Sequence, residues 1–258
     1  MKRKIFRWAI RIFVAILLLL GILVTLVLTP SLMYANKTSL GNFTVYHNKP
    51  LDKALQQRLD SATEILKTSE FYDANIKFNI CMNDGSRYPA LVQTFLGRAF
   101  ALGYTSNKVT LCGQVNVKDN YVQVNGCNWN LVQLLAHEET HCLVFHKYGF
   151  WRSNPVANQP LWKWEGYPEY VSRRAADQTD LVANIEKLNE VERKDKDGWG
   201  ISFADSTLSP KEYFHYRLLV QYCLDIKKMT YDNLLKDTTS EQTTSTQMMN
   251  WYAAQKNK

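Results

Sequence analysis

The chain has 258 residues, of which 31 are Lys or Arg and 24 are Asp or Glu, so its formal net charge is +7. Five of the basic residues lie within the first 11 positions, which leaves the remainder close to neutral and does not indicate a nucleic-acid-binding protein. Beyond the N-terminal segment, the length suffices for one globular domain with a hydrophobic core.

The N-terminal segment has the pattern of a membrane anchor. Residues 2–11 carry basic but no acidic side chains, and the apolar run 12–28 follows. A helix over this run is about 26 Å long, close to the thickness of the hydrocarbon core of a bilayer. We expect residues 1–30 to form a cytoplasmic basic tip and an uncleaved, single-pass transmembrane signal anchor, with the rest of the chain outside the cytoplasm. A cleavable signal peptide is the alternative, but its apolar region is usually shorter than this one.

The next segments predict a short tether followed by an α+β domain. Residues 31–41 are polar and mixed, as a tether would be, and residues 42–258 are expected to form the domain. Strand patterns lie at 43–47, 76–81, 108–112 and 120–124, an amphipathic helix is predicted at 50–69, and residues 91–102 fit a short helix or an irregular loop.

Five cysteines are present, and none of them forms a C-x-x-C pair. A cysteine zinc site or a thioredoxin-type motif is therefore not indicated. In an oxidising compartment a bridge from Cys112 to Cys81 or to Cys127 is possible, and the odd count leaves at least one thiol free.

The strongest motif is His137-Glu-x-x-His141, inside a stretch without Gly or Pro that predicts a helix from Trp129 to Tyr148. Four-residue spacing places both imidazoles on one face of the helix, one turn apart, where they can bind one metal ion. Glu138 can then reach a metal-bound water as a general base.

A catalytic zinc site needs three protein ligands and an open position. Glu165 is the candidate third ligand, in the segment LWKWEGYPEY at 161–170. Glu169 follows one helical turn later, where it can accept a hydrogen bond from a ligand histidine and fix the tautomer of that histidine.

These motifs resemble the gluzincin clan of zinc peptidases. The segment 161–170 is similar to the Leu-Trp-x-x-Glu-Gly-x-x-x-Tyr pattern of the membrane alanyl aminopeptidase and leukotriene hydrolase branch, and of smaller peptidase MA-like proteins. The resemblance implies Zn²⁺ on His137, His141 and Glu165, Glu138 as the general base, and Glu169 behind a ligand histidine. It also implies a zincin-like fold, with a small mixed-sheet lobe and a helical lobe, whose edge strand beside the cleft binds an extended peptide. We expect 108–112 or 120–124 to be that strand.

After Tyr170 the sequence predicts mostly helix. The pattern predicts helices at 181–191, from a capping box at Ser209-Pro-Lys-Glu212 to about 226, from Thr230 to 235, and at 248–254, with a charged loop at 192–200. By resemblance to the aminopeptidase helix, Tyr213 is the candidate donor that stabilises the oxyanion, with Tyr216 and His215 as neighbouring alternatives.

Two departures from the family qualify the expected activity. No Gly-x-Met-Glu-Asn segment precedes the zinc motif, so the sequence does not support aminopeptidase activity. In addition, 23 residues separate His141 from Glu165, which predicts an outward-bulging insertion between the two ligand helices. The sequence therefore predicts a membrane-anchored zinc metallopeptidase acting on peptide or protein substrates. The alternative is a membrane-tethered zincin-fold binding or scaffold protein without activity, although a purely structural zinc site would need no Glu138.

Overall fold

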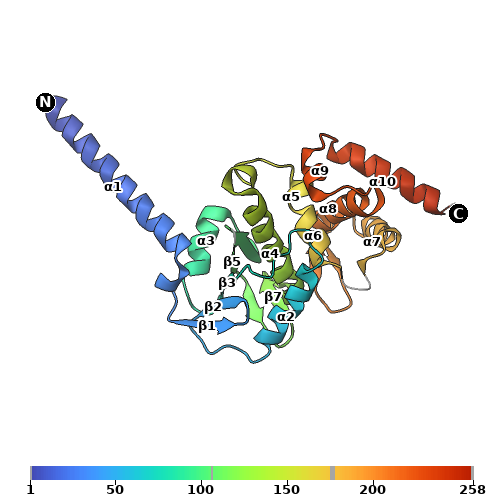
Figure 1. Ribbon diagram of the computed structural model, residues 1–258, viewed down its shortest axis with the longest axis horizontal. Coiled ribbons are helices and arrows are strands. Elements are labelled where there is room, and N and C mark those ends of the chain that lie inside the picture. The colour runs from blue at the N-terminus through green and yellow to red at the C-terminus, as the bar shows by residue number, and fades with distance from the viewer. Residues whose placement is uncertain (1, 106, 175–177, 257–258) are drawn as a thin grey trace.

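The computed structural model describes residues 2–105, 107–174 and 178–256, which form a mixed α and β domain preceded by one long helix (Figure 1). That helix, α1 (Lys2–Leu28), projects away from the domain, and its segment Phe6–Leu28 is long and apolar enough to cross a membrane. It ends before Thr29-Pro30, where proline disfavours a helical residue in front of it. The expected N-terminal apolar helix is confirmed.

A five-stranded sheet of order β1-β2-β3-β5-β4 forms the first part of the domain. The three central strands are parallel, and the two edge strands are antiparallel to their neighbours. The strands are β1 (Asn36–Leu40), β2 (Phe43–His47), β3 (Phe78–Cys81), β4 (Ala101–Tyr104) and β5 (Lys108–Leu111). The three central strands were predicted. The expectation of a tether is wrong for Asn36–Leu40, since this segment is an edge strand.

Alternation along the strands gives the sheet two different faces. Val45 and Ile80 belong to the main hydrophobic core, which they share with helices from one side, while the next residues, Tyr46 and Cys81, belong to a smaller cluster on the other side. The helices are α2 (Leu55–Leu66) and α4 (Leu131–Tyr148) in the main core, and α3 (Tyr88–Leu96) in the smaller cluster. The helix predicted at 50–69 thus begins at Leu55, and the segment 91–102 contains both the end of α3 and the start of β4.

The second part of the domain is mainly helical, with two small sheets against it. The sheets are β6 (Gln114–Asn116), β7 (Tyr121–Val124) and β8 (Cys127–Asn130) in one, and β9 (Gly200–Ser202) and β10 (Leu208–Pro210) in the other. The helices are α5 (Leu161–Trp164), α6 (Gly166–Ser172), α7 (Leu181–Lys194), α8 (Lys211–Gln221), α9 (Tyr231–Lys236) and α10 (Glu241–Lys256), with a 3₁₀ turn η2 (Phe150–Arg152) and a π-helical turn η4 (Tyr222–Ile226). A further 3₁₀ turn, η1 (Pro30–Leu32), connects α1 to β1. Figure 1 shows α6 and α8 side by side next to α4.

Several local predictions for this part are confirmed and others need correction. Thr230 caps α9 as expected, by accepting from the backbone N–H of Asn233. Ser209 does not cap α8, because it lies in β10 and Pro210 occupies the position before the helix. Helix α7 extends into the predicted loop at 192–200 as far as Lys194, and α10 is longer than the predicted 248–254.

The cysteines form no bridge. All five lie in the described ranges, and each is a free thiol, so neither pairing of Cys112 is made. Four of the five are buried, where they pack as small apolar side chains.

Candidate metal centre

Helix α4 carries the two histidines through the centre of the domain. The side chain of Asn130 caps its start by accepting from the N–H of Gln133, and Gly149, with a φ of 74°, ends it. His137 and His141 are only 3% and 8% exposed. Their rings lie one turn apart with centroids 5.0 Å from each other, so both face the same point beside the helix.

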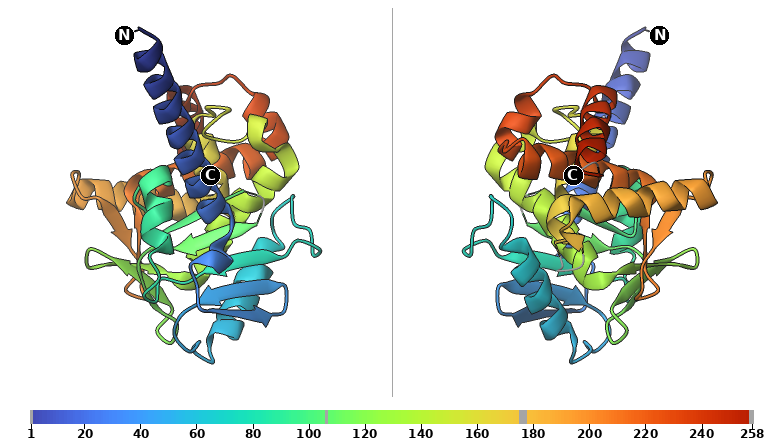
Figure 2. Two further views of the ribbon diagram at one scale, coloured as in Figure 1. Left: turned by 90° about the vertical axis from the view of Figure 1, so that its left-hand side faces the viewer. Right: turned by 90° about the vertical axis from the view of Figure 1, so that its right-hand side faces the viewer.

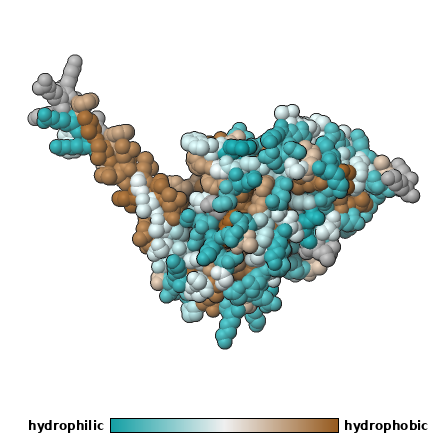
Figure 3. Space-filling view, in the orientation of Figure 1, coloured by the Kyte–Doolittle hydropathy of each residue, from teal (hydrophilic) through white to brown (hydrophobic). Residues whose placement is uncertain are grey.

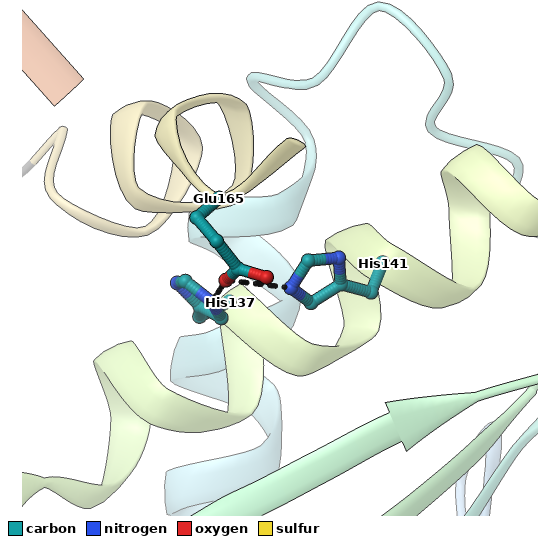
Figure 4. A group of neighbouring side chains, drawn as sticks. All are labelled: His137, His141 and Glu165. Atoms are coloured by element: carbon teal, nitrogen blue, oxygen red, sulfur yellow. Dashed lines mark ion pairs between the residues drawn. The ribbon is translucent and has the colours of Figure 1, made fainter. Parts of the chain in front are cut away.

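Glu165 reaches that point from the junction of α5 and α6 (Figure 4). The following residue, Gly166, allows α6 to approach α8 closely, since a Cβ atom there would lie 2.7 Å from the carbonyl oxygen of Tyr216. This close packing of α6 between α4 and α8 directs the Glu165 carboxylate toward the two imidazoles.

The three side chains form a group that could hold a metal ion. The Oε2 atom of Glu165 lies 3.4 Å from Nε2 of His137 and 3.3 Å from Nε2 of His141. In a tetrahedral zinc site with bonds of 2.0–2.1 Å, neighbouring donor atoms are about 3.3 Å apart. The nitrogen and oxygen donors present fit such an ion in chemical type, and the two distances from the carboxylate to the imidazoles match this spacing.

Glu169 fixes the orientation of His137 from the opposite side of the ring. Its Oε2 lies 3.1 Å from Nδ1 of His137, and its Oε1 accepts from the guanidinium of Arg173 and, at 2.8 Å, from the hydroxyl of Ser209. A hydrogen bond from Nδ1–H to Glu169 leaves the Nε2 lone pair free for a metal. Arg173 also donates to the side chain of Gln133 at 2.8 Å, which ties this network back to α4.

Charge and burial act against each other in this network. Burial lowers the pKa of His137, but the hydrogen bonds to Glu165 and Glu169 outweigh it and raise the pKa to about 10. Burial raises the pKa of Glu169, but the charge of Arg173 and the hydrogen bond to His137 outweigh it, and the pKa lies well below its ordinary value. Without a metal, the histidine is therefore held as a cation between carboxylates.

Glu138 lies on the side of the centre that faces the edge of the sheet. Its Oε2 accepts a 2.5 Å hydrogen bond from the backbone N–H of Gly103 in β4. Burial raises the pKa of Glu138, while the charges of His137 and His141 act in the opposite direction. A carboxylate that is held in place next to the candidate ligands suits a group that exchanges a proton.

Strand β4 is the edge strand beside the centre, which corrects the sequence-based prediction. The segment 108–112 contains β5, which lies between β3 and β4, and 120–124 contains β7, which lies between β6 and β8. Close packing of β4 on α4 requires glycine, because a Cβ atom on Gly103 would lie 2.3 Å from the carbonyl oxygen of Glu138.

Tyr213 lies against the centre, whereas the two neighbouring alternatives point elsewhere. Its ring is parallel to that of His137, with centroids 6.1 Å apart. Burial, followed by the charges of Glu165 and Glu138, raises the pKa of Tyr213. Tyr216 instead donates to Glu212 at 2.6 Å, and His215 lies 4.0 Å from Glu241.

Four residues of this region were not recognised in the sequence: Gly103, Gln133, Arg173 and Ser209. Arg173 carried a local signal, because it follows Glu169 by four residues on a helix. A glycine within a strand pattern also indicates close approach of another backbone, which applies to Gly103. Ser209 and Gln133 had no such signal, since their roles depend on tertiary contacts.

Searches of protein-family models and of curated proteins find no match to this chain. The resemblance to gluzincins thus rests on the motif residues. What the structure establishes is a mixed α and β domain in which His137, His141 and Glu165 form a group that could hold a metal ion.

Proposed function

We propose that the protein is a membrane-anchored zinc metallopeptidase of gluzincin type, with a zincin-like domain outside the cytoplasm. The observation that supports this most strongly is the convergence of His137, His141 and Glu165 from two separate helices, with the Glu138 carboxylate beside them. The basic residues before α1 favour the cytoplasm as the location of the N-terminus.

Each side chain has a defined task in this proposal. His137, His141 and Glu165 would hold Zn²⁺, which supplies a water of lowered pKa and polarises the carbonyl of the scissile bond. Glu138 takes a proton from the attacking water and delivers it to the leaving amine. The Gly103 N–H fixes one oxygen of that carboxylate and leaves the other to carry the proton.

Tyr213 is the proposed donor to the oxyanion. The raised pKa keeps its phenol protonated at neutral pH, so that the hydroxyl can donate a hydrogen bond to developing negative charge. The stacked contact with His137 holds the ring beside the metal ligands.

Strand β4 is the proposed binding edge for an extended peptide. It is an edge of the five-stranded sheet, and the Gly103 N–H points from this edge toward α4. A substrate pairing with β4 would therefore place its main chain next to Glu138.

The test compares Glu138→Gln with Glu139→Gln in the full-length protein. Glu139 is the next residue of the same helix, is fully buried, and has no hydrogen-bond partner for either carboxylate oxygen among the described residues. We expect Glu138→Gln to keep stoichiometric zinc and to lose peptide hydrolysis by about 10²–10⁴-fold, with hydrolysis intact in Glu139→Gln. Activity is measured on a broad peptide library, and zinc by elemental analysis.

Two results of this test contradict the proposal in different ways. Unchanged hydrolysis in Glu138→Gln removes the assigned base. Stoichiometric zinc in the wild type without cleavage of any peptide favours the binding or scaffold protein instead.

A further inference from the structure

The end of α1 is fixed to the domain by hydrogen bonds. The hydroxyl of Tyr88, a fully buried residue at the start of α3, donates at 2.6 Å to the carbonyl oxygen of Val27. That carbonyl is among the last four of α1, which have no partner within the helix. Next to it, Ser86 donates to the carbonyl of Met33, and Tyr34 donates to that of Met82. The orientation of the domain relative to α1 is therefore set by this junction.

The connection between α4 and α5 exposes several large apolar side chains. We call residues 149–161 the α4–α5 tip, and it includes the insertion noted between the two ligand helices. Trp151 is 78% exposed, Leu161 59% and Phe150 54%. The tip is ordered, because the side chain of Asn154 accepts from the N–H of Gln159 and donates to its carbonyl. An ordered segment that presents a Trp and a Phe to its surroundings indicates a contact surface.

The charged residues within the tip and the end of α4 are basic, and an acidic residue beside them is Asp232 of α9, which accepts a hydrogen bond from the Tyr148 hydroxyl at 3.2 Å. No acidic residue occurs between Glu139 and Glu165, whereas Lys147 and Arg152 are basic. The Arg152 guanidinium lies over the ring of Tyr148, 5.2 Å from its centroid. Exposed aromatic side chains on a segment whose own charged residues are Lys and Arg are typical of the interface between a bilayer and water.

The tip lies on the upper side of the domain, toward which α1 points in all three views. Figure 1 shows α1 leaving the left side of the domain and pointing to the upper left, while the end of α4 and the connection to α5 lie at the top of the domain. In both views of Figure 2, α1 runs upward along one side of the domain and extends past its top. Figure 3 shows that the apolar surface of α1 continues onto the part of the domain beside its base. There α3 contacts α1, and its Phe95 and Leu96 are 50% and 44% exposed.

We propose that the α4–α5 tip rests in the headgroup region of the same bilayer that α1 spans. This inference depends on the proposed membrane insertion of α1, but not on peptidase activity. The domain would then have two contacts with the membrane, the fixed junction below α1 and the aromatic tip.

Such a position narrows the substrate class of the proposed peptidase. His141 and Tyr148 are seven residues apart on α4, which corresponds to about 10 Å along the helix. With the tip at the headgroups, the metal centre lies within a short distance of the membrane surface. The peptide bonds within reach are those in membrane-proximal segments of other proteins or in peptides bound to the bilayer.

The test uses tryptophan quenching in the full-length protein in nanodiscs, with lipids brominated on the acyl chains compared with unbrominated lipids. Trp8 in α1 reports insertion of that helix, and Trp151 reports the tip. Trp199 is the matched control, since it is also more than half exposed, at 54%, but precedes β9. In Figure 2 the chain around it (orange) lies at one side of the domain and not at its top.

We expect Trp151→Phe to remove a large part of the quenched emission, and the double substitution of Trp8 and Trp151 by Phe to remove nearly all of it. Trp199→Phe leaves the quenched amplitude unchanged. Equal quenching in wild type and Trp151→Phe overturns the contact of the tip with lipid. If Trp151 is shielded from aqueous iodide but not quenched by bromolipid, a protein covers the tip instead, which also overturns the inference. Absence of quenching from Trp8 shows that α1 does not span the bilayer.

Discussion

The candidate metal centre and the junction with α1 lie on opposite faces of one sheet, and both bury many polar groups. At the candidate metal centre the buried groups are acidic and basic side chains: Glu138, Glu165, Glu169 and Arg173 surround the two histidines. At the junction they are neutral hydroxyls. Tyr104 and Tyr88 share a hydrogen bond, and the Tyr88 hydroxyl donates a hydrogen bond to the Val27 carbonyl. Both faces thus bury polar groups that are hydrogen-bonded to one another. On the face of the candidate metal centre, the charges of these groups respond to pH and to a bound metal. On the face of the junction, the neutral hydroxyls respond to neither.

The largest expected effect on stability comes from breaking the charged network. Glu169→Ala leaves the fully buried Arg173 without its carboxylate, which we expect to lower the free energy of unfolding by about 3–5 kcal/mol. It also releases Nδ1 of His137, so metal affinity falls by about 10–100-fold. Denaturant unfolding and metal titration measure the two effects.

The matched control for this change is Glu190→Ala. Glu190 also pairs with a basic residue four positions later, Lys194 at 2.5 Å, but on the surface. Its removal leaves the unfolding midpoint nearly unchanged. Equal destabilisation by both substitutions would show that burial does not strengthen the Glu169 pair.

In the metal-free protein, we expect the unfolding free energy to depend on pH through the face of the candidate metal centre and not through the face of the junction. His137 has a pKa of about 10 in the folded protein, above its ordinary value of 6.5. Its contribution to stability is therefore fully present below pH 6.5 and is lost as the pH rises through about 10. We expect the free energy of unfolding in a chelator to fall over this range, and the stabilisation by added zinc to grow as protons leave the site. If Tyr88→Phe and the wild type show the same dependence of unfolding free energy on pH, this supports the assignment of the pH dependence to His137. A flatter dependence in Tyr88→Phe contradicts that assignment.

At the junction the expected effect is smaller and independent of metal. Tyr88→Phe removes the hydroxyl that bonds Val27 and Tyr104, which costs about 1–3 kcal/mol of unfolding free energy. The same loss is expected with zinc and with chelator. Tyr46→Phe is the control, because Tyr46 belongs to the same cluster but its hydroxyl makes no hydrogen bond within the described residues. A loss that depends on zinc would mean that the two faces are coupled.

The smallest effect is expected at Ser209. Ser209→Ala removes one of several donors to Glu169, while Arg173 and His137 remain bound to that carboxylate. We expect a loss of about 1 kcal/mol and little change in metal affinity, measured in the same unfolding and titration experiments. If Ser209→Ala lowered the zinc affinity as much as Glu169→Ala does, Ser209 would be the residue on which the orientation of His137 depends.

The sequence was sufficient for those parts of the centre that depend on local spacing. The helix that carries His137 and His141 has continuous apolar periodicity and clear ends, and the turn from Glu165 to Glu169 follows from a spacing of four. These relations hold within one or two helices, so that tertiary structure does not alter them.

The relations that the sequence did not reveal all join distant segments. Strand β4 is four residues long and contains a glycine, and β1 is polar, so neither has the pattern of a buried strand. The conformation of β1 depends on its pairing with β2, and that of β4 depends on its pairing with β5 and on the contact of Gly103 with Glu138. Ser209 fits a capping box by its neighbours, but pairing of β10 with β9 takes it away from the start of α8 and toward Glu169.

The short junction at Pro30–Tyr34 has a geometric consequence. Because hydrogen bonds hold both of its ends, the domain has little freedom to rise or turn relative to α1. A peptidase attached in this way would cut at one height above the lipid, and a protein whose scissile bond lies higher would escape cleavage. Inserting residues before Tyr34 would shift that height and, with it, the set of proteins that are cut.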